Sequence, residues 1–331
     1  MTIALGIEGT AHTLGIGIID DTGKVLSNVY DMYSPKTGGI HPREAANHHV
    51  LKAREILERA LTAANLTIDD IDVIAFSQGP GLGPCLRVTA TISRALSLFK
   101  NKPLVGVNHS IAHIEIARMI SKEEDPLTVY VSGGNTIISA YTGKRYRAFG
   151  ETLDIAIGNL LDTFARAAGI AYPGGPVIEK LARKAKVYHQ LPYSVKGMDI
   201  SFSGILTAAI RLLKEDKVPL EEICYSLQET VFGMIAEVTE RALVHTNKRS
   251  IILTGGVARN RRLQEILQGV ADEHSASYHT VPKDLAGDNG AMIAWTGILQ
   301  YKYGRTLKIE DSYVRPKWRI EDVEIPWRNQ R

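Results

Sequence analysis

Two histidines at helical spacing are the residues of this chain whose types and positions most directly suggest chemistry. His109 and His113 lie four positions apart in a segment that is typical of the start of a helix. Residues i and i+4 of a helix lie on the same face, so the two imidazoles could bind one metal ion. Ordinary surface or core histidines can have the same spacing, so the pair alone leaves both interpretations open.

The residue after the first histidine bears on which reaction such a metal would serve. In His-Glu-x-x-His zinc peptidases, the glutamate directly after the first histidine acts as the general base. Ser110 stands at that position here. The pattern is therefore compatible with a bound metal but argues against a peptidase of that kind.

Other histidines and one aspartate are further candidates. Asp288 lies in the sequence Gly-Asp-Asn-Gly before the last helical pattern, where it could either cap the helix or complete a metal site with a histidine pair. His41, His48 and His49 have no evident partner in the sequence, and we expect them mainly at the surface.

Three glycine-rich segments follow predicted strands, at residues 79–83, 131–136 and 254–260. Glycine lets the backbone approach a phosphate closely, and backbone amides at turns and helix N-termini bind anions. None of these segments has the ending of a Walker loop or the spacing of the dinucleotide fingerprint. Each could be a simple tight turn, whereas two such loops in one cleft would favour a nucleotide.

Charged side chains add weaker indications. Asp162 and Glu179 flank a turn at residues 172–176, and Glu179 could reach a ribose hydroxyl, although an exposed helical carboxylate commonly has no such role. Cationic residues near aromatic ones suit contact with RNA, but packing of the tail through its tryptophans explains them equally well. These cations are Arg259, Arg261 and Arg262 at a predicted helix start, and Arg315, Lys317, Arg319, Arg328 and Arg331 around Trp318 and Trp327.

The composition is that of an ordinary globular protein. A length of 331 residues predicts two domains, and a net charge of +3 is too small to establish nucleic-acid binding. Cys85 and Cys224 are far apart in sequence, as expected in a reducing compartment. No signal peptide and no apolar stretch of about 18 residues is evident, so we expect a cytoplasmic protein without a membrane segment.

Hydrophobic patterns predict that two α/β halves position these residues. Apolar runs separated by glycine turns predict a strand–turn–strand–turn–strand opening over residues 3–33, and a similar opening recurs over 127–149. Strands alternate with helices in both halves, which indicates two α/β lobes with a ligand cleft between them. Further strands are predicted at 71–76 and 250–253, and helices at 41–64, 85–98, 155–168, 176–186, 220–246, 261–272 and 291–301.

A series of motifs in chain order carries a resemblance to a known family. They lie at residues 6–12, 38–45, 78–84, 108–115, 130–136, 201–204, 255–260 and 287–290. Over residues 3 to about 318 the chain resembles the universal tRNA threonylcarbamoyltransferase family, in the archaeal and eukaryotic branch that supplies the catalytic subunit of the KEOPS complex. Asn135 and Leu206 stand where the bacterial branch has histidine and lysine, which favours the archaeal-type branch.

The resemblance implies a fold and a reaction. The fold is α/β, of the actin/sugar-kinase/Hsp70 type, with two ribonuclease-H-like lobes around an interlobe cleft. We expect lobe I over residues 1–125 and about 292–318, lobe II over 126–291 and a tail over 319–331. The implied reaction transfers a threonylcarbamoyl group from threonylcarbamoyl-adenylate to N6 of the adenosine beside the anticodon, in tRNAs that read ANN codons. The tRNA amine attacks directly, so no protein nucleophile is expected.

The resemblance also implies roles for individual residues. Metal ligands are expected at His109, His113, Tyr130 and Asp288, with iron as the metal and zinc as the alternative. Glu8 and Asn135 are the catalytic candidates. The positions that match the family's nucleotide-binding residues are Tyr130, Val131, Ser132, Gly133, Gly134, Asp162, Gly175, Glu179 and Asn260.

The expected partners are tRNA, a small atypical protein kinase, the other KEOPS subunits and a separate enzyme that makes the adenylate. Three alternative functions have distinct signatures. A metallopeptidase predicts a base beside the histidine pair, where Ser110 stands. A small-molecule kinase of the same fold predicts phosphate transfer from ATP to an alcohol. A non-enzymatic nucleic-acid-binding subunit predicts RNA binding that survives loss of the metal ligands.

Overall fold

The computed structural model describes residues 1–35 and 39–328. Gly38 of the 38–45 motif and Arg331 of the tail lie outside the described residues. The chain divides into two compact units. Unit 1 comprises Met1–Ile120, Thr142–Tyr146 and Asp288–Arg331, and unit 2 comprises Ser121–Tyr141 and Arg147–Gly287. The lobe boundaries expected from the sequence stay a prediction.

Unit 1 is built on a five-stranded mixed sheet in the order β3-β2-β1-β4-β5. The two hairpins β1–β2 and β2–β3 are antiparallel, whereas β1, β4 and β5 are parallel. The parallel strands have their carboxyl ends at one edge of the sheet, where ligands commonly bind in α/β folds. The strands are β1 (Ile3–Glu8), β2 (Thr13–Asp20), β3 (Val25–Met32), β4 (Val73–Gly79) and β5 (Leu104–Asn108).

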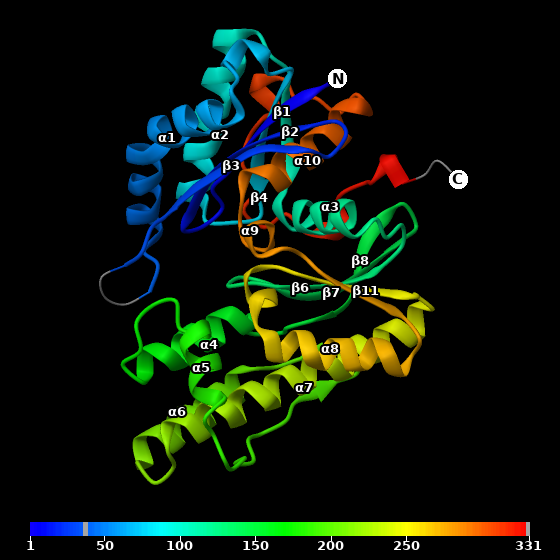
Figure 1. The fold of residues 1–331 in the computed structure, drawn as a ribbon. Helices are drawn as coiled ribbons and strands as arrows, with labels where there is room; N and C mark the ends of the chain where they lie inside the picture. The colour runs from blue at the N-terminus through cyan, green and yellow to red at the C-terminus, as the bar shows by residue number, and fades with distance from the viewer. Residues whose placement is uncertain (36–38, 329–331) are drawn as a thin grey trace. The chain divides into compact units, whose positions relative to one another are not determined.

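Helices cover both faces of this sheet (Figure 1). Leu5 and Ile7 of β1 face α1 (Pro42–Ala64) and α2 (Gly83–Lys100), because alternate residues of a strand point to opposite faces. Ala4 lies in the opposite core, with α3 (His109–Ser121) and α10 (Gly290–Lys302). Glycine at position 6 lets α10 approach β1 closely, since a side-chain carbon there would lie 2.2 Å from the backbone nitrogen of Ala294.

Unit 2 repeats this arrangement with a second five-stranded sheet, in the order β12-β11-β6-β7-β8. The β6–β7 hairpin is antiparallel, and β6, β11 and β12 are parallel. An antiparallel hairpin followed by two parallel strands thus occurs in both sheets, in agreement with the two similar openings in the sequence. The strands are β6 (Leu127–Val131), β7 (Thr136–Thr142), β8 (Arg145–Glu151), β11 (Ser250–Thr254) and β12 (Ser277–Thr280).

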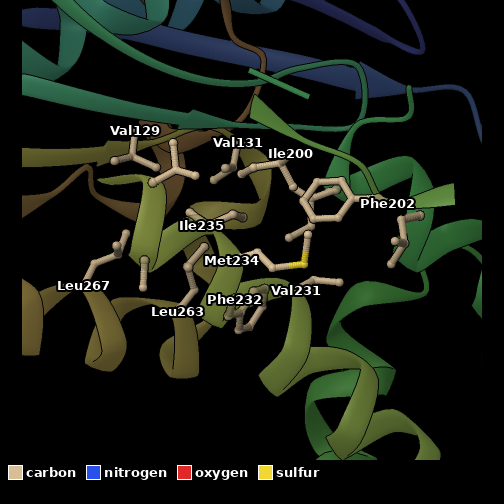
Figure 2. Packing of buried hydrophobic residues seen from close by; sticks show 14 of the residues in the cluster. Val129, Val131, Ile200, Phe202, Val231, Phe232, Met234, Ile235, Leu263 and Leu267 are labelled. Atoms are coloured by element: carbon tan, nitrogen blue, oxygen red, sulfur yellow. The ribbon is translucent and has the colours of Figure 1, made fainter. Parts of the chain in front are cut away.

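Alternate residues of β6 point to one face of the sheet, and helices of unit 2 pack on that face (Figure 2). Val129 and Val131 of β6 contact a core to which α7 (Leu220–Thr246) contributes Val231 and Ile235, and α8 (Arg261–Glu273) contributes Leu263 and Leu267. A short hairpin, β9 (Val195–Lys196) and β10 (Asp199–Ile200), adds to this unit. The helices are α4 (Ile157–Ala167), α5 (Gly175–Ala182), α6 (Ser203–Glu215), α7 (Leu220–Thr246), α8 (Arg261–Glu273) and α9 (Lys283–Ala286).

The helices predicted from hydrophobic periodicity are confirmed, with α7 at its predicted bounds and most others displaced by a few residues at their ends. Helix α6 was not predicted, although Ile205 and Ala209 on its buried face have helical spacing. None of the helices in the described part of the chain combines the length and apolar character needed to span a bilayer.

Candidate functional site

Three side chains that can ligate a metal meet at one edge of the sheet of unit 1. Strand β5 ends at Asn108, so α3 begins with His109 and places His113 one turn further on. The ligand atoms of His109, His113 and Asp288 all lie within 4.8 Å of one another. Oδ1 of Asp288 is 3.2 Å from Nε2 of His113 and 3.6 Å from Nε2 of His109. Among the described residues, these three form the group of histidine, cysteine and carboxylate side chains whose spacing could hold a metal ion.

Asp288 does not cap the helix that follows it. The N-cap of α10 is Asn289, whose side chain accepts a hydrogen bond of 3.0 Å from the backbone nitrogen of Met292. The carboxylate of Asp288 is directed to the two histidines instead. Of the two roles that the sequence left open for Asp288, the geometry favours the ligand role.

A second carboxylate orients the first histidine. Nδ1 of His109 lies 2.9 Å from Oε2 of fully buried Glu8, at the end of β1. The other oxygen of Glu8 accepts hydrogen bonds from the backbone nitrogen and Oγ1 of Thr10, at 2.7 and 2.6 Å. A carboxylate that accepts from one imidazole nitrogen leaves the lone pair of the other nitrogen for a metal. The Glu8–His109 contact therefore fixes the tautomer that a metal ligand requires.

Burial and charge act in opposite directions on these groups. Burial alone would lower the pKa of His109, but the charges of Glu8 and Asp288 outweigh it and raise this pKa to about 9. Burial lowers the pKa of His113, against the hydrogen bond to Asp288. Burial opposes ionisation of Asp288, yet the positive charge of His109 lowers its pKa. Without a metal, the proton of His109 supplies the positive charge between the two carboxylates.

The residues present fit a metal ion. Two imidazole nitrogens and one carboxylate oxygen suit iron, zinc and other first-row transition metals, and a divalent cation could replace the proton of His109 between the carboxylates. Tyr130, the fourth ligand expected from the resemblance, belongs to unit 2, so its part in the metal shell stays a prediction.

The expected nucleotide-binding residues lie in unit 2, and Tyr130 to Gly134 and Asn260 lie at or after the carboxyl ends of two parallel strands. Thr254, the last residue of β11, pairs with Tyr130 near the end of β6, so the two glycine segments begin side by side. Gly255 has a positive φ of 100°, and a side-chain carbon there would lie 2.1 Å from the carbonyl oxygen of Val131. Glycine at position 255 is therefore required for this close approach.

The turn after β6 leaves its glycines open. Oγ of Ser132 accepts hydrogen bonds from the backbone nitrogens of Gly134 and Asn135, at 3.3 and 3.0 Å. No heavy atom of the described residues lies within 4 Å of a side-chain carbon placed on Gly133 or Gly134, outside their chain neighbours. Nδ2 of Asn135 donates to the hydroxyl oxygen of Tyr130 at 3.3 Å. The turn thus has room for a ligand against its backbone.

The remaining candidates of unit 2 all have partners within the protein. Oδ1 of Asp162, on α4, accepts a 2.8 Å hydrogen bond from the backbone nitrogen of Gly174, which precedes Gly175 at the start of α5. Oε1 of Glu179 accepts from the backbone nitrogen of Arg261 at 3.2 Å and from Arg183 at 2.5 Å. These contacts join α4, α5 and the start of α8.

Asn260 stands at the N-terminus of α8. Its Oδ1 caps the helix by accepting from the backbone nitrogens of Arg262 and Leu263, at 2.9 and 3.3 Å. Its Nδ2 donates to Oε1 of Gln228 at 3.0 Å. The nucleotide-binding roles of Asn260 and of the other unit 2 candidates stay predictions.

The expectation that His48 and His49 lie mainly at the surface is wrong for His49. This residue is fully buried on the inner face of α1, because Gly9 offers no side chain and leaves room for the imidazole. His48 is partly buried, with Nε2 2.6 Å from Oδ1 of Asp31. The helical spacing of Ala45 and His49, which share the buried face, is a signal that could have identified this position.

Sequence reasoning also missed Thr10, whose two hydrogen bonds hold Glu8.

Trp318 is buried, at 9% exposure, so its indole is not available to stack on an RNA base. The other aromatic residue of the tail, Trp327, is half-buried.

Comparisons with known proteins find relatives over nearly the whole chain. The model of the family described as tRNA N6-adenosine threonylcarbamoyltransferase matches residues 24–295. The chain is 56% identical to the tRNA N6-adenosine threonylcarbamoyltransferase of Thermococcus kodakarensis over 325 residues, which cover 98% of this chain and 99% of that protein.

A longer relative and a solved structure extend the comparison. The chain is 54% identical over 325 residues, 98% of its length, to a probable bifunctional tRNA threonylcarbamoyladenosine biosynthesis protein of Methanocaldococcus jannaschii, and covers 60% of that protein. The crystal structure of HypF from T. kodakarensis superposes with a TM-score of 0.64 at 16% identity, over 95% of this chain and 49% of HypF. This likeness concerns the fold and agrees with the actin/sugar-kinase/Hsp70-type fold expected from the sequence. The chain belongs to the tRNA N6-adenosine threonylcarbamoyltransferase family.

Proposed function

We propose that this chain transfers the threonylcarbamoyl group of threonylcarbamoyl-adenylate to N6 of the adenosine next to the anticodon, in tRNAs that read ANN codons. The observation that carries the proposal is the cluster of His109, His113 and Asp288 with Glu8 behind it, in a chain of this family. The product would be N6-threonylcarbamoyladenosine.

The metal site would hold one ion per chain, iron or alternatively zinc, through His109, His113 and Asp288, with Tyr130 as the expected fourth ligand. When bound, such an ion supplies Lewis-acid polarisation of the carbamoyl carbonyl and neutralises charge on the adenylate phosphate. Glu8 contributes by holding His109 in the tautomer that presents Nε2. Glu8 therefore acts as a positioning residue.

The nucleotide would be held by unit 2. The open backbone at Gly133 and Gly134 is suited to an anionic phosphate, since backbone amides of a glycine turn can point at it. The protein contacts of Glu179 go to Oε1, so Oε2 is the oxygen proposed to accept from a ribose hydroxyl. Asn135 would turn its amide from Tyr130 towards the transferring group.

No side chain is assigned as a nucleophile, because the exocyclic amine of the tRNA adenosine attacks the carbamoyl carbon itself. The two cysteines support this, since both are free and buried. Burial raises the pKa of Cys85 to about 11 and that of Cys224 to about 12, so neither is a reactive thiolate at neutral pH. Free buried thiols also accord with a cytoplasmic location.

The partners proposed are tRNA, the small atypical protein kinase and other subunits of a KEOPS-type complex, and a separate enzyme that makes the adenylate. The M. jannaschii relative, whose name describes it as bifunctional and which is longer than this chain, supports a physical association with another activity of the same pathway.

Mass spectrometry of tRNA nucleosides tests the proposal. tRNA that lacks the modification is incubated with this chain, the reconstituted partner subunits, the adenylate synthase, threonine, bicarbonate and ATP. We expect N6-threonylcarbamoyladenosine only when this chain is present. Phosphorylation of a small alcohol, or peptide hydrolysis sensitive to chelators, without modified tRNA would favour the kinase or peptidase alternative.

A further inference from the structure

A group of cations around Gly83 has no role in the chemistry proposed above. Arg87 is exposed near the start of α2, Lys317 is exposed in the C-terminal segment, and Arg315 is half-buried. A side-chain carbon on Gly83 would lie 3.6 Å from Nη1 of Arg87 and 4.0 Å from Cγ of Pro316. Arg87 therefore adjoins the segment that carries Arg315 and Lys317. We call these three residues the 87/315/317 surface.

The charges of the 87/315/317 surface are not compensated. No carboxylate of the described residues pairs with any of its three cations. Two other exposed arginines of unit 1 are paired, Arg305 with Glu324 at 2.9 Å and Arg319 with Glu321 at 3.2 Å. The surface thus presents three positive charges to an anionic ligand.

Arg315 is held in a geometry suited to phosphate. Its guanidinium carbon lies 4.2 Å from the ring centre of Trp318, and the buried indole provides a fixed support. A guanidinium stacked on an aromatic face keeps the N–H groups at its edge available for two parallel hydrogen bonds to a phosphate.

Two sets of hydrogen bonds fix this surface relative to the metal site within unit 1. The backbone nitrogen of Gly81 donates to the carbonyl of Pro316 at 3.2 Å, and that of Leu82 donates to the carbonyl of Thr10 at 2.7 Å. Thr10 in turn donates to Glu8.

The second set involves the residue before His109. Nδ2 of Asn108 donates to the carbonyl of Trp318 at 3.2 Å, while Oδ1 of Asn108 accepts from the backbone nitrogen of Ile111 in the first turn of α3. The cationic segment is therefore tied to the helix that carries both histidines.

We propose that the 87/315/317 surface contacts the phosphodiester backbone of the substrate tRNA and holds the RNA beside the metal site. The proposal rests on the proposed function, which requires an RNA to approach His109 and Asp288. Phosphate contacts position an RNA without reading its sequence, which is what a transferase acting on several tRNAs needs. The net charge of +3 is no obstacle, since the contact depends on local charge.

The test uses the full chain with its partner subunits and fluorescently labelled tRNA. The variant is Arg87→Ala with Lys317→Ala, because both side chains are exposed and their removal should not disturb folding. The control is Lys308→Ala, an exposed lysine next to Leu307, whose backbone pairs with Leu104 at the start of β5. Trp318, which supports Arg315 of the 87/315/317 surface, contacts Asn108 at the other end of that strand.

We expect the double variant to raise the tRNA Kd roughly tenfold and to make the slope of log K against log salt shallower by about two, one per lost contact. The control should match the wild type, and kcat at saturating tRNA should stay within about twofold. Arg87→Lys should retain most of the affinity. Melting followed by circular dichroism verifies that each variant is folded.

Unchanged tRNA affinity and salt slope in the folded double variant would overturn the proposal. So would loss of a protein subunit from the complex with tRNA affinity intact, since the surface would then bind protein. The two proposals fail separately. If the wild type modifies tRNA normally and the double variant binds tRNA like the wild type, only the proposed role of the surface is refuted. If the double variant binds tRNA more weakly but the wild type forms no modified nucleoside, only the proposed function is refuted.

Discussion

Nδ1 of His109 lies 2.9 Å from the fully buried carboxylate of Glu8, so the imidazole presents its other nitrogen to Asp288. The pair joins the end of the first strand to the start of a helix 101 residues later in the chain. Glu8 therefore controls the orientation of a proposed ligand without being a ligand itself. Contacts of this kind strongly influence metal affinity.

Glu8→Gln should weaken metal binding by about 10- to 100-fold, because a neutral amide holds His109 less firmly and does not fix its tautomer. Competition with a chelator of known affinity measures the change. An unaltered affinity would show that Glu8 does not orient a ligand.

Asp288→Ala and Asn289→Ala should distinguish the residue that binds the metal from the residue that caps α10. Asp288→Ala should abolish stoichiometric metal binding, since its carboxylate oxygen faces both imidazoles. Asn289→Ala should retain the metal but lower the free energy of unfolding by about 1 kcal/mol, through loss of the N-cap of α10. Metal content by plasma mass spectrometry and urea unfolding distinguish the two. The opposite pattern would contradict the assignment.

His49 should make stability fall at acidic pH. Burial and the charge of His48 lower the pKa of His49 from 6.5 to about 4, so the unfolded chain binds a proton here more readily than the folded one. The stabilisation is present above pH 6.5 and is lost as the pH falls towards 4, by up to about 3 kcal/mol. The free energy of unfolding, measured with urea, should differ less between pH 5.0 and pH 7.5 for His49→Gln than for the wild type. Equal differences would contradict the prediction.

Gly6→Ala should destabilise the protein by about 3 kcal/mol or more, since the added carbon would lie 2.2 Å from the backbone of α10. Gly269→Ala is the matched control. Position 269 is in α8 with open space around it, so alanine should be neutral or stabilise by up to about 1 kcal/mol. Thermal unfolding compares the two, and a Gly6→Ala protein as stable as the control would contradict the packing described.

Local patterns in the sequence predicted much of the fold. The helix at residues 220–246 and the two strand-led openings follow from periodicity and glycine turns, which depend on neighbouring residues. The choice between cap and ligand for Asp288 could not be made this way, because the answer depends on His113, 175 residues away. Burial of His49 and Trp318 likewise depends on distant contacts. The resemblance to the family identified four candidate metal ligands, and the fold brings three of them together.

We predict that the metal held by His109, His113 and Asp288 is required for tRNA modification. The most direct test is nucleoside mass spectrometry of tRNA treated with the reconstituted system, in which this chain carries His109→Ala with His113→Ala. Metal content is measured on the same protein, and Lys308→Ala serves as the control. We predict a folded double variant without metal that forms no N6-threonylcarbamoyladenosine, beside a control with full metal and activity. Full modification by the metal-free variant would contradict the account.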